Sequence, residues 1–252
     1  MIRLATAANP SAVFSTAPLN LWPMHVAILN YSGNVGKSTI ARLCLRPRMR
    51  SCPVFFVESI NEGGDASNIG GRHFRDVLVE ISVLDNAIVD IGSSNIEQVL
   101  IQLNRMEDAH EDFDYYVIPT VPSQKQQRDT IRTFHALMEM GILPDKIRIV
   151  LNQAEPDTDC RKQFSLVMAA LEIFDLRFEA VIYMSEVFPL LENLTLEQAI
   201  SEGTDFKAKI AATADVELKR DLARALGISR LARTARKDLD AAFESMFASV
   251  KT

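Results

Sequence analysis

The fold of this chain is decided by the stretch Asn30-Tyr31-Ser32-Gly33-Asn34-Val35-Gly36-Lys37-Ser38-Thr39. It follows an apolar run at 25–29, which predicts a strand, and it leads into 40–45, which has helical periodicity. A strand, a glycine-bearing loop and a helix that starts with Lys-Ser-Thr can hold the phosphates of a nucleoside triphosphate, because backbone N–H groups and a helix N-terminus attract anions. Lys37 would neutralise the outer phosphates, and the Ser38 hydroxyl would bind Mg²⁺. The alternative is an ordinary turn in which Lys37 is a solvated residue at a helix start.

The loop departs from the common phosphate-binding pattern at one position. That pattern has a glycine five residues before the last glycine, where this chain has Tyr31. The variant loop of the ParA/MinD superfamily, Lys-Gly-Gly-x-Gly-Lys-Ser/Thr, aligns without gaps with residues 32–38, so the chain resembles that superfamily. Ser32 replaces the first lysine of the variant loop, and Asn34, a residue that tolerates positive φ, replaces its second glycine. In the superfamily the first lysine reaches the nucleotide of a partner subunit, a contact that Ser32 cannot make.

Two further segments sharpen the resemblance. Val-Glu-Ser-Ile-Asn at 57–61 and Val-Asp-Ile-Gly at 89–92, together with the loop, are most similar to the StbB-like plasmid stability proteins of this superfamily. The resemblance runs from about Met24 into the C-terminal region. It implies that ATP and Mg²⁺ are the ligands and that the nucleotide is contacted by the loop residues Gly33, Asn34, Val35, Gly36, Lys37, Ser38 and Thr39.

The composition is that of a soluble globular protein. The chain has 252 residues, 48% of them hydrophobic and 24% charged, which is ordinary for one α/β domain. The net charge of −6 excludes a polycation, so any contact with DNA must come from a local basic surface. The three cysteines have no metal-binding spacing and indicate reduced thiols, and no segment is long enough to span a membrane. We therefore expect a cytoplasmic protein.

Apolar runs alternate with amphipathic stretches after Met24. Strands are expected at 25–29, 54–57, 87–90, 115–118, 147–151 and 180–183, and helices at about 73–82, 95–107, 124–140 and 160–174. This alternation predicts an α/β fold, a doubly wound, mainly parallel sheet with helices on both faces and a C-terminal helical extension. We expect three parts: a disordered N-terminal extension at 1–23, a P-loop nucleotide-binding domain at 24–204, and a helical segment at 205–252 packed on the same domain. Gly227 is expected at the turn of a hairpin within that last segment.

The carboxyl ends of the expected strands carry further candidates for the site. Asp90 closes Ala-Ile-Val-Asp, where a carboxylate can orient the magnesium shell, although a turn or N-cap role is the alternative. Asn152 closes Ile-Val-Leu-Asn, the position that reads the adenine edge in the superfamily, and its alternative is a turn former. Glu58 ends the second strand. The superfamily's water-positioning aspartate falls on Ile60, so Glu58 or Glu62 substitutes for it or turnover is very slow.

Two basic clusters remain. One comprises Arg42, Arg46, Arg48 and Arg50, and the other has seven basic residues between 217 and 238. Either cluster can be a solvated helix surface or a contact for DNA phosphates. Lys125 and Arg128 could replace the charge missing at Ser32, although a solvated helix face is the simpler interpretation.

The resemblance then implies the function. We expect a ParA-like ATP-binding switch and slow ATPase in plasmid stability, segregation or positioning, with a link to conjugative transfer. Its partners would be a second copy in a nucleotide-dependent homodimer, a plasmid-encoded DNA-binding protein, and DNA itself through basic C-terminal helices. Lys37, Glu58 and Asp90 would serve catalysis. The alternative is a nucleotide-gated adaptor without useful catalysis that links a DNA-bound partner to a host-cell component.

Overall fold

The structure is a computed structural model, and it describes residues 23–50, 52–57, 74–174, 176, 178, 180–191, 194–201 and 203–247. Apart from Pro23, the N-terminal extension expected at 1–23 lies outside the described residues, as do Glu58, Ile60 and Glu62. No helix among the described residues is both long enough and apolar enough to cross a membrane.

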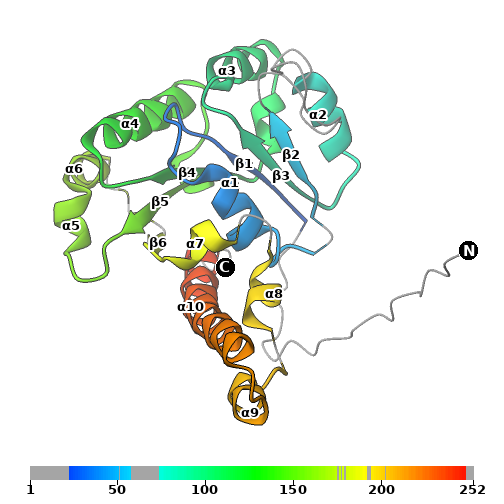
Figure 1. Ribbon diagram of the computed structural model, residues 1–252. Coiled ribbons are helices and arrows are strands. Elements are labelled where there is room, and N and C mark those ends of the chain that lie inside the picture. The colour runs from blue at the N-terminus through cyan, green and yellow to red at the C-terminus, as the bar shows by residue number, and fades with distance from the viewer. Residues whose placement is uncertain are drawn as a thin grey trace, which may run out of the picture.

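Six parallel strands form one sheet in the order β2-β3-β1-β4-β5-β6 (Figure 1). The strands are β1 (Met24–Ile28), β2 (Val54–Val57), β3 (Asn86–Ile91), β4 (Tyr115–Thr120), β5 (Ile147–Ala154) and β6 (Ala180–Tyr183). Their apolar runs are nearly continuous because helices cover both faces of a parallel sheet. The α/β fold predicted from the sequence is confirmed, and the sheet is wholly parallel. The strand order reverses around β1, which places the loop after β1 at the point where doubly wound sheets bind ligands.

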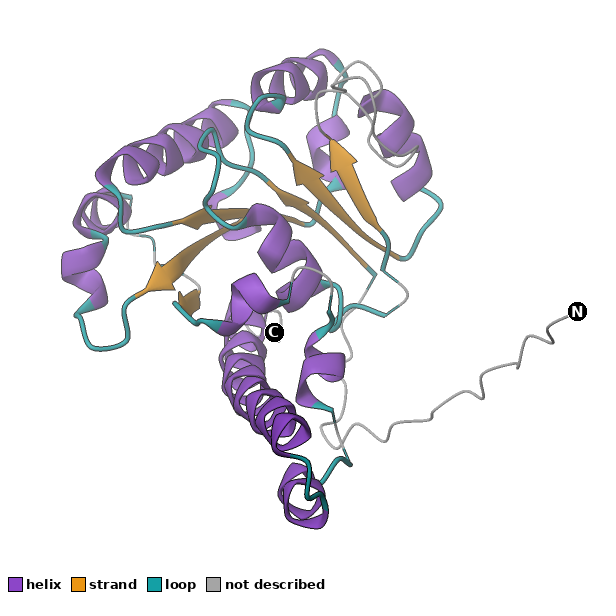
Figure 2. Cartoon of the chain, viewed as in Figure 1, coloured by secondary structure: helices purple, strands orange, loops and turns teal. Residues whose placement is uncertain are grey.

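Two apolar cores lie on opposite faces of the sheet. Alternate residues of β1 show the division, since Ala27 faces one core and Val26 and Ile28 face the other. The first face is covered by α2 (Phe74–Ile81), α3 (Ile96–Arg105), α4 (Gln124–Glu139), α5 (Cys160–Gln163) and α6 (Ser165–Ile173). The second is covered by α1 (Lys37–Thr39), η1 (Ile40–Leu45), α7 (Val187–Leu190), α8 (Leu196–Ile200) and α10 (Val216–Phe247). The secondary structure in Figure 2 makes the two layers of helices visible.

The remaining elements are short. They are η3 (Ala109–Asp112), η4 (Pro144–Lys146) and α9 (Phe206–Ala212). The helix expected at 160–174 is divided at Phe164, which is fully buried and has non-helical dihedral angles. The helix after the loop widens into a turn with five-residue spacing, in which the Arg46 N–H donates to the Ala41 carbonyl at 3.0 Å.

The expectation of a hairpin turn at Gly227 is wrong. Helix α10 runs without interruption from Val216 to Phe247, and the turn lies between α9 and α10. There the Asp215 carboxylate accepts hydrogen bonds from the N–H groups of Glu217 and Leu218, at 2.9 and 3.3 Å, and so begins the helix. A single glycine costs a helix only about 1 kcal/mol. The apolar stripe of α10, buried against the sheet from Ala232 onward, outweighs that cost.

Candidate functional site

The loop predicted to bind phosphate lies between β1 and α1 at the carboxyl edge of the sheet. Asn34 and Gly36 have positive φ angles of 58° and 88°, the kind of left-handed backbone with which successive N–H groups can line a concavity that binds anions. Asn34 therefore takes the conformation that the sequence led us to expect. Gly33, Asn34 and Ser38 are exposed, whereas Val35 is buried in the core beneath the loop. The loop thus has left-handed residues of the kind found in anion-binding loops, and part of it is exposed.

Lys37 is largely buried inside this loop. Its ammonium group donates a hydrogen bond to the Ser32 carbonyl oxygen at 3.0 Å, and the residue is only 8% exposed. A solvated lysine at a helix start would be extended into water, so this alternative does not describe Lys37. The ammonium is held against the backbone of the loop, where its charge would be near a phosphate bound by the loop.

Asp90 lies beside the loop at the carboxyl end of β3. It is paired in register with Ile28 on β1, two residues before the loop begins, and it is 3% exposed. The chain then turns through Gly92 toward the loop, and Ser93 Oγ lies 3.4 Å from where a Cβ at Gly33 would be. A buried carboxylate and the exposed Ser38 hydroxyl therefore border the same loop. Their oxygen atoms are the ligand type that Mg²⁺ prefers.

Asn152 contacts the loop directly. Its side-chain N–H donates to the Val35 carbonyl at 2.9 Å, and this bond joins residues 117 positions apart. A Cβ at Gly36 would lie 2.1 Å from Asn152 Nδ2, so only glycine fits there without displacing the amide. The structure thus gives Asn152 a role in holding the loop to β5, while its reading of an adenine edge stays a prediction.

Helix α4 holds the first half of the loop, which the sequence analysis did not predict. The Asn30 amide donates to the Thr130 hydroxyl at 2.7 Å and to the Pro119 carbonyl at 2.9 Å. The Tyr31 N–H donates to the Thr133 hydroxyl at 3.1 Å. The β-hydroxyl residues along one face of α4 were the only available signal, and nothing in the sequence shows which segment they meet.

Tyr31 occupies the place of the missing glycine and packs against α4. The Arg132 guanidinium lies 3.9 Å from the centre of the Tyr31 ring and forms an ion pair with Glu97 of α3 at 3.0 Å. Partial burial raises the pKa of the Tyr31 phenol, against the lowering influence of the Arg132 charge. The ring thus serves packing at the base of the loop, and a glycine at this position would lose these contacts.

Other candidates are placed away from the loop interior. Lys125 and Arg128 are exposed on α4, and Arg128 contacts Gln124 at 3.4 Å, so the alternative of a solvated helix face describes them. Cys44 and Cys52 are buried, and burial raises the pKa of each thiol to about 12, which excludes them as thiolate nucleophiles near neutral pH. Among the described residues, no group of three His, Cys, Asp or Glu side chains could hold a metal ion by itself.

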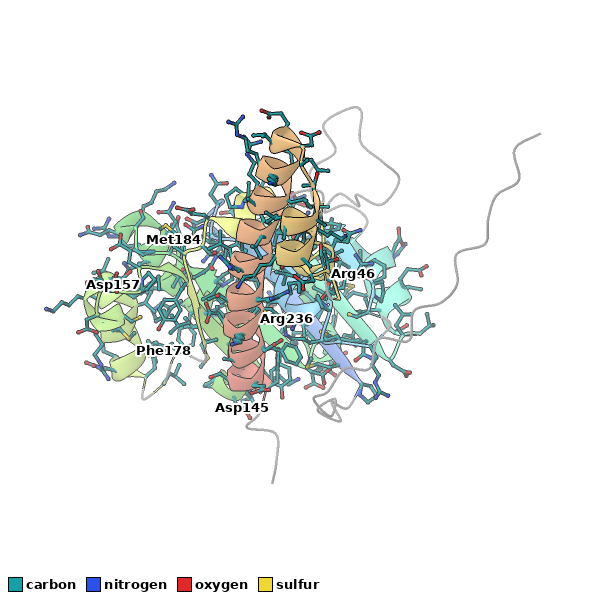
Figure 3. All side chains as sticks on the ribbon, turned by 60° about the horizontal axis from the view of Figure 1, so that its bottom comes forward. Arg46, Asp145, Asp157, Phe178, Met184 and Arg236 are labelled. Carbon is teal, nitrogen blue, oxygen red and sulfur yellow. The ribbon has the colours of Figure 1, made fainter. Side chains whose placement is uncertain are left out.

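Two members of the first basic cluster differ: Arg48 makes structural hydrogen bonds, and Arg46 lies on the surface. Arg48 closes the end of η1 by donating to the carbonyls of Leu43 and Cys44 at 2.9 and 2.6 Å. It also donates to Asp240 of α10, with its closest contact at 2.5 Å. Arg46 is exposed, and it is labelled with Arg236 in Figure 3. Arg48 therefore joins the helix that follows the loop to α10.

The second basic cluster lies on α10. Figure 3 shows α10 crossing the molecule with its start projecting beyond the rest of the domain, and Figure 1 shows α9 at that end of α10. No residue of α10 before Ser229 is buried. Its outer side carries four cations that form no ion pair among the described residues: Lys219, Arg230, Arg233 and Lys237. This side of the helix is a basic surface available to an anionic partner.

These residues fit a magnesium-bound nucleoside triphosphate. The loop supplies the Lys37 ammonium and a left-handed backbone at Asn34 and Gly36, and it lies so close to Asn152 that there is no room for a Cβ at Gly36. Lys37 and the N–H groups would hold the phosphates, and Ser38 and Asp90 would hold the ion or its water shell. The ion, when bound, neutralises negative charge on the terminal phosphates.

Comparisons with known proteins agree on the fold. No protein-family model matches the chain, and no curated protein matches it by sequence. Solved structures do match. A chain of the MinC:MinD cell division protein complex of Aquifex aeolicus superposes with a TM-score of 0.53 at 13% identity, covering 91% of this chain and 98% of the other. A Borrelia burgdorferi B31 protein assigned to plasmid partition, bound to AMPPNP, gives 0.51 at 12% identity, with 90% and 99% covered.

A third match carries a metal-bound nucleotide. MinD from Pyrococcus horikoshii OT3, complexed with Mg-ADP, gives a TM-score of 0.51 at 13% identity, with 90% of this chain and 97% of that chain covered. The similarity extends over nearly the whole length of each protein. The chain therefore has the fold of the ParA/MinD ATPases, and identities this low establish the fold alone.

Proposed function

We propose that this protein is a magnesium- and ATP-binding switch of the ParA/MinD kind that serves plasmid stability. The observation that carries the proposal is the loop geometry: positive φ angles at Asn34 and Gly36, with the Lys37 ammonium inside the loop and Asp90 beside it. Solved structures of the same fold contain AMPPNP and Mg-ADP. The resemblance to StbB-like proteins supplies the process, namely segregation or positioning of a plasmid, with conjugative transfer as a further process it could serve.

Slow hydrolysis is part of the proposal. Ser32 has no charge to offer a second nucleotide, and its hydroxyl is already bonded to Asp129 within the same chain. Removing one preorganised electrostatic contact lowers a rate by about 10²–10³. We therefore expect Lys37 and Asp90 to support nucleotide binding and only slow turnover. A role for Glu58 in catalysis is proposed from the sequence alone, because it lies outside the described residues.

The proposed partners follow from the same resemblance and from the surface of α10. A second copy would associate in the nucleotide-bound state, and a plasmid-encoded DNA-binding protein would be the regulatory partner. The basic surface of Lys219, Arg230, Arg233 and Lys237 suits non-specific contact with DNA phosphates, which would weaken steeply as salt rises.

The second candidate function is a nucleotide-gated adaptor without useful catalysis. The bond between Ser32 and Asp129 favours it, because position 32 is occupied within its own chain and lacks a charge. Both candidates require nucleotide binding, and they differ in turnover. Single-turnover hydrolysis of ATP, measured beside binding, separates them: slow but real hydrolysis supports the switch, and binding without hydrolysis supports the adaptor.

The decisive experiment for both is Lys37→Ala. Because hydrogen bonds to charged groups contribute about 1.5–3 kcal/mol each, ATP affinity measured by titration calorimetry should fall by at least about 2 kcal/mol, or roughly 30-fold. Lys209→Ala is the matched control, since Lys209 is exposed on α9, far along the chain from the loop, and its loss should leave affinity unchanged. Equal ATP affinity in the wild type and in Lys37→Ala would refute the phosphate-binding assignment.

A further inference from the structure

The contacts between α4 and the loop fix the loop from one side. Thr130 and Thr133 each use the hydroxyl twice: each accepts from the loop and donates to a carbonyl of α4, at 2.8 and 2.7 Å. A hydroxyl with one proton can donate only once, so both directions are determined. The loop side of α4 is therefore a fixed hydrogen-bonding surface built to receive Asn30 and Tyr31.

Ser32 adds a charged group to this surface. Its hydroxyl donates a hydrogen bond to the Asp129 carboxylate, and the residue is only 3% exposed. Its N–H donates to the Asn30 side chain at 2.7 Å, and its carbonyl accepts from Lys37. Ser32 is thus held by three polar contacts at once, and Asp129 and Lys37 meet at the same residue, one at its side chain and one at its backbone.

Asp129 carries its negative charge without an ion pair among the described residues. Lys125, four residues earlier on α4, forms no such pair, and Arg132 is engaged with Glu97 and the Tyr31 ring. The only side chain that Asp129 contacts by hydrogen bond in that part of the chain is Ser32. The carboxylate is half-buried, which limits screening of its charge by solvent.

This charge lies beside a site that must receive a polyanion. A carboxylate near a bound triphosphate repels it, and partial burial makes the repulsion stronger than it would be in bulk water. The same carboxylate, however, accepts a hydrogen bond that holds the loop in its phosphate-binding form. The two effects of Asp129 on nucleotide affinity have opposite signs.

We propose that Asp129 is a positioning residue of the nucleotide site, which holds the loop through Ser32 and also keeps the affinity for polyphosphate low. The inference rests on the proposed function, because it assumes that the loop binds a nucleotide. A residue of α4, outside the loop, would therefore help to set the affinity for the nucleotide. The low affinity would make the bound state sensitive to nucleotide concentration.

Three variants separate the two effects. Asp129→Asn keeps an acceptor oxygen for the Ser32 hydroxyl and removes the charge, so affinity for ATP should rise about three- to tenfold at low ionic strength, and the gain should be smaller at high salt. Ser32→Ala keeps the charge and removes the hydrogen bond, so affinity should fall below that of the wild type. Asp129→Ala removes both, and its affinity should lie below that of Asp129→Asn.

The control is Glu107→Gln, which makes the same charge change at an exposed residue after α3 and should alter affinity by less than about twofold. The claim that the Asp129 charge lowers ATP affinity would be overturned if Asp129→Asn bound ATP no more tightly than the wild type at low salt. The claim that Asp129 holds the loop through Ser32 would be overturned by two results together. These are wild-type ATP affinity in Ser32→Ala and equal ATP affinities in Asp129→Asn and Asp129→Ala.

A measurement without nucleotide keeps this inference distinct from the proposed function. Hydrogen exchange of the Ser32 amide should accelerate in Asp129→Ala and stay slow in Asp129→Asn, because only the alanine variant removes the bond that ties Ser32 to α4. If the wild type fails to bind ATP, the proposed function fails, and the exchange experiment still tests whether Asp129 holds the loop. Unchanged exchange in Asp129→Ala would refute that role.

Discussion

Replacing Gly36 by alanine tests the contact between the loop and β5. The new Cβ would lie 2.1 Å from Asn152 Nδ2, far inside contact distance, and the backbone there has φ of 88°. A left-handed conformation costs an L-residue about 1–2 kcal/mol. Moving the Asn152 amide away from the Val35 carbonyl leaves a buried polar group without its partner, at about 1–3 kcal/mol. By adding these two costs, we expect Gly36→Ala to lower the free energy of unfolding by about 2–5 kcal/mol.

A double-mutant cycle isolates the steric part. In an Asn152→Ala background the amide is absent, so Gly36→Ala should lower the free energy of unfolding only by the cost of the left-handed conformation, about 1–2 kcal/mol. The coupling energy between the two positions should then be about 1–3 kcal/mol. Urea unfolding followed by far-ultraviolet circular dichroism gives the four free energies, provided that the m values agree. Gly141→Ala is a matched control, because Gly141 has φ of 86° and no atom lies within 4 Å of the place that its new Cβ would take. Equal costs at positions 36 and 141, unaltered by Asn152→Ala, would refute the argument.

Three further predictions concern the metal, the long helix and its attachment. Asp90→Ala should weaken calorimetric ATP affinity more in the presence of Mg²⁺ than in its absence, since the carboxylate acts through the ion; equal losses would exclude that role. Gly227→Ala should raise the free energy of unfolding by about 0.5–1 kcal/mol in urea, because Gly227 lies inside α10 with open space around it, whereas a residue at a hairpin turn would be destabilised. Arg48→Met should lower the same free energy by about 1.5–3 kcal/mol, because the carbonyls at the end of η1 lose a charged donor; Arg50→Met, at an exposed residue, should change it by less than about 0.5 kcal/mol.

Local sequence determined the elements and the chemistry at their ends. The apolar runs of the strands, the Gly-Lys-Ser-Thr of the loop and the aspartate near the end of β3 each depend on neighbours within a few residues. Propensity and periodicity act over that range. The parallel sheet followed because strands that alternate with helices can bury both faces in few other ways. That Lys37 and Asp90 lie at one edge of the sheet was predictable for the same reason, since the ends of β1 and β3 meet there.

Tertiary structure decided how the loop is held. The bonds from Asn30 to Thr130 and from Asn152 to Val35 join residues 100 and 117 positions apart. No local pattern in the sequence pairs such residues. The turn expected at Gly227 failed for a related reason: its local preference of about 1 kcal/mol is smaller than the gain from burying the far half of α10 on the sheet. The sequence by itself therefore determined the loop that we propose binds phosphate. Only the folded chain decided that α4 and β5 hold it, because those contacts form between segments that meet only once the sheet has assembled.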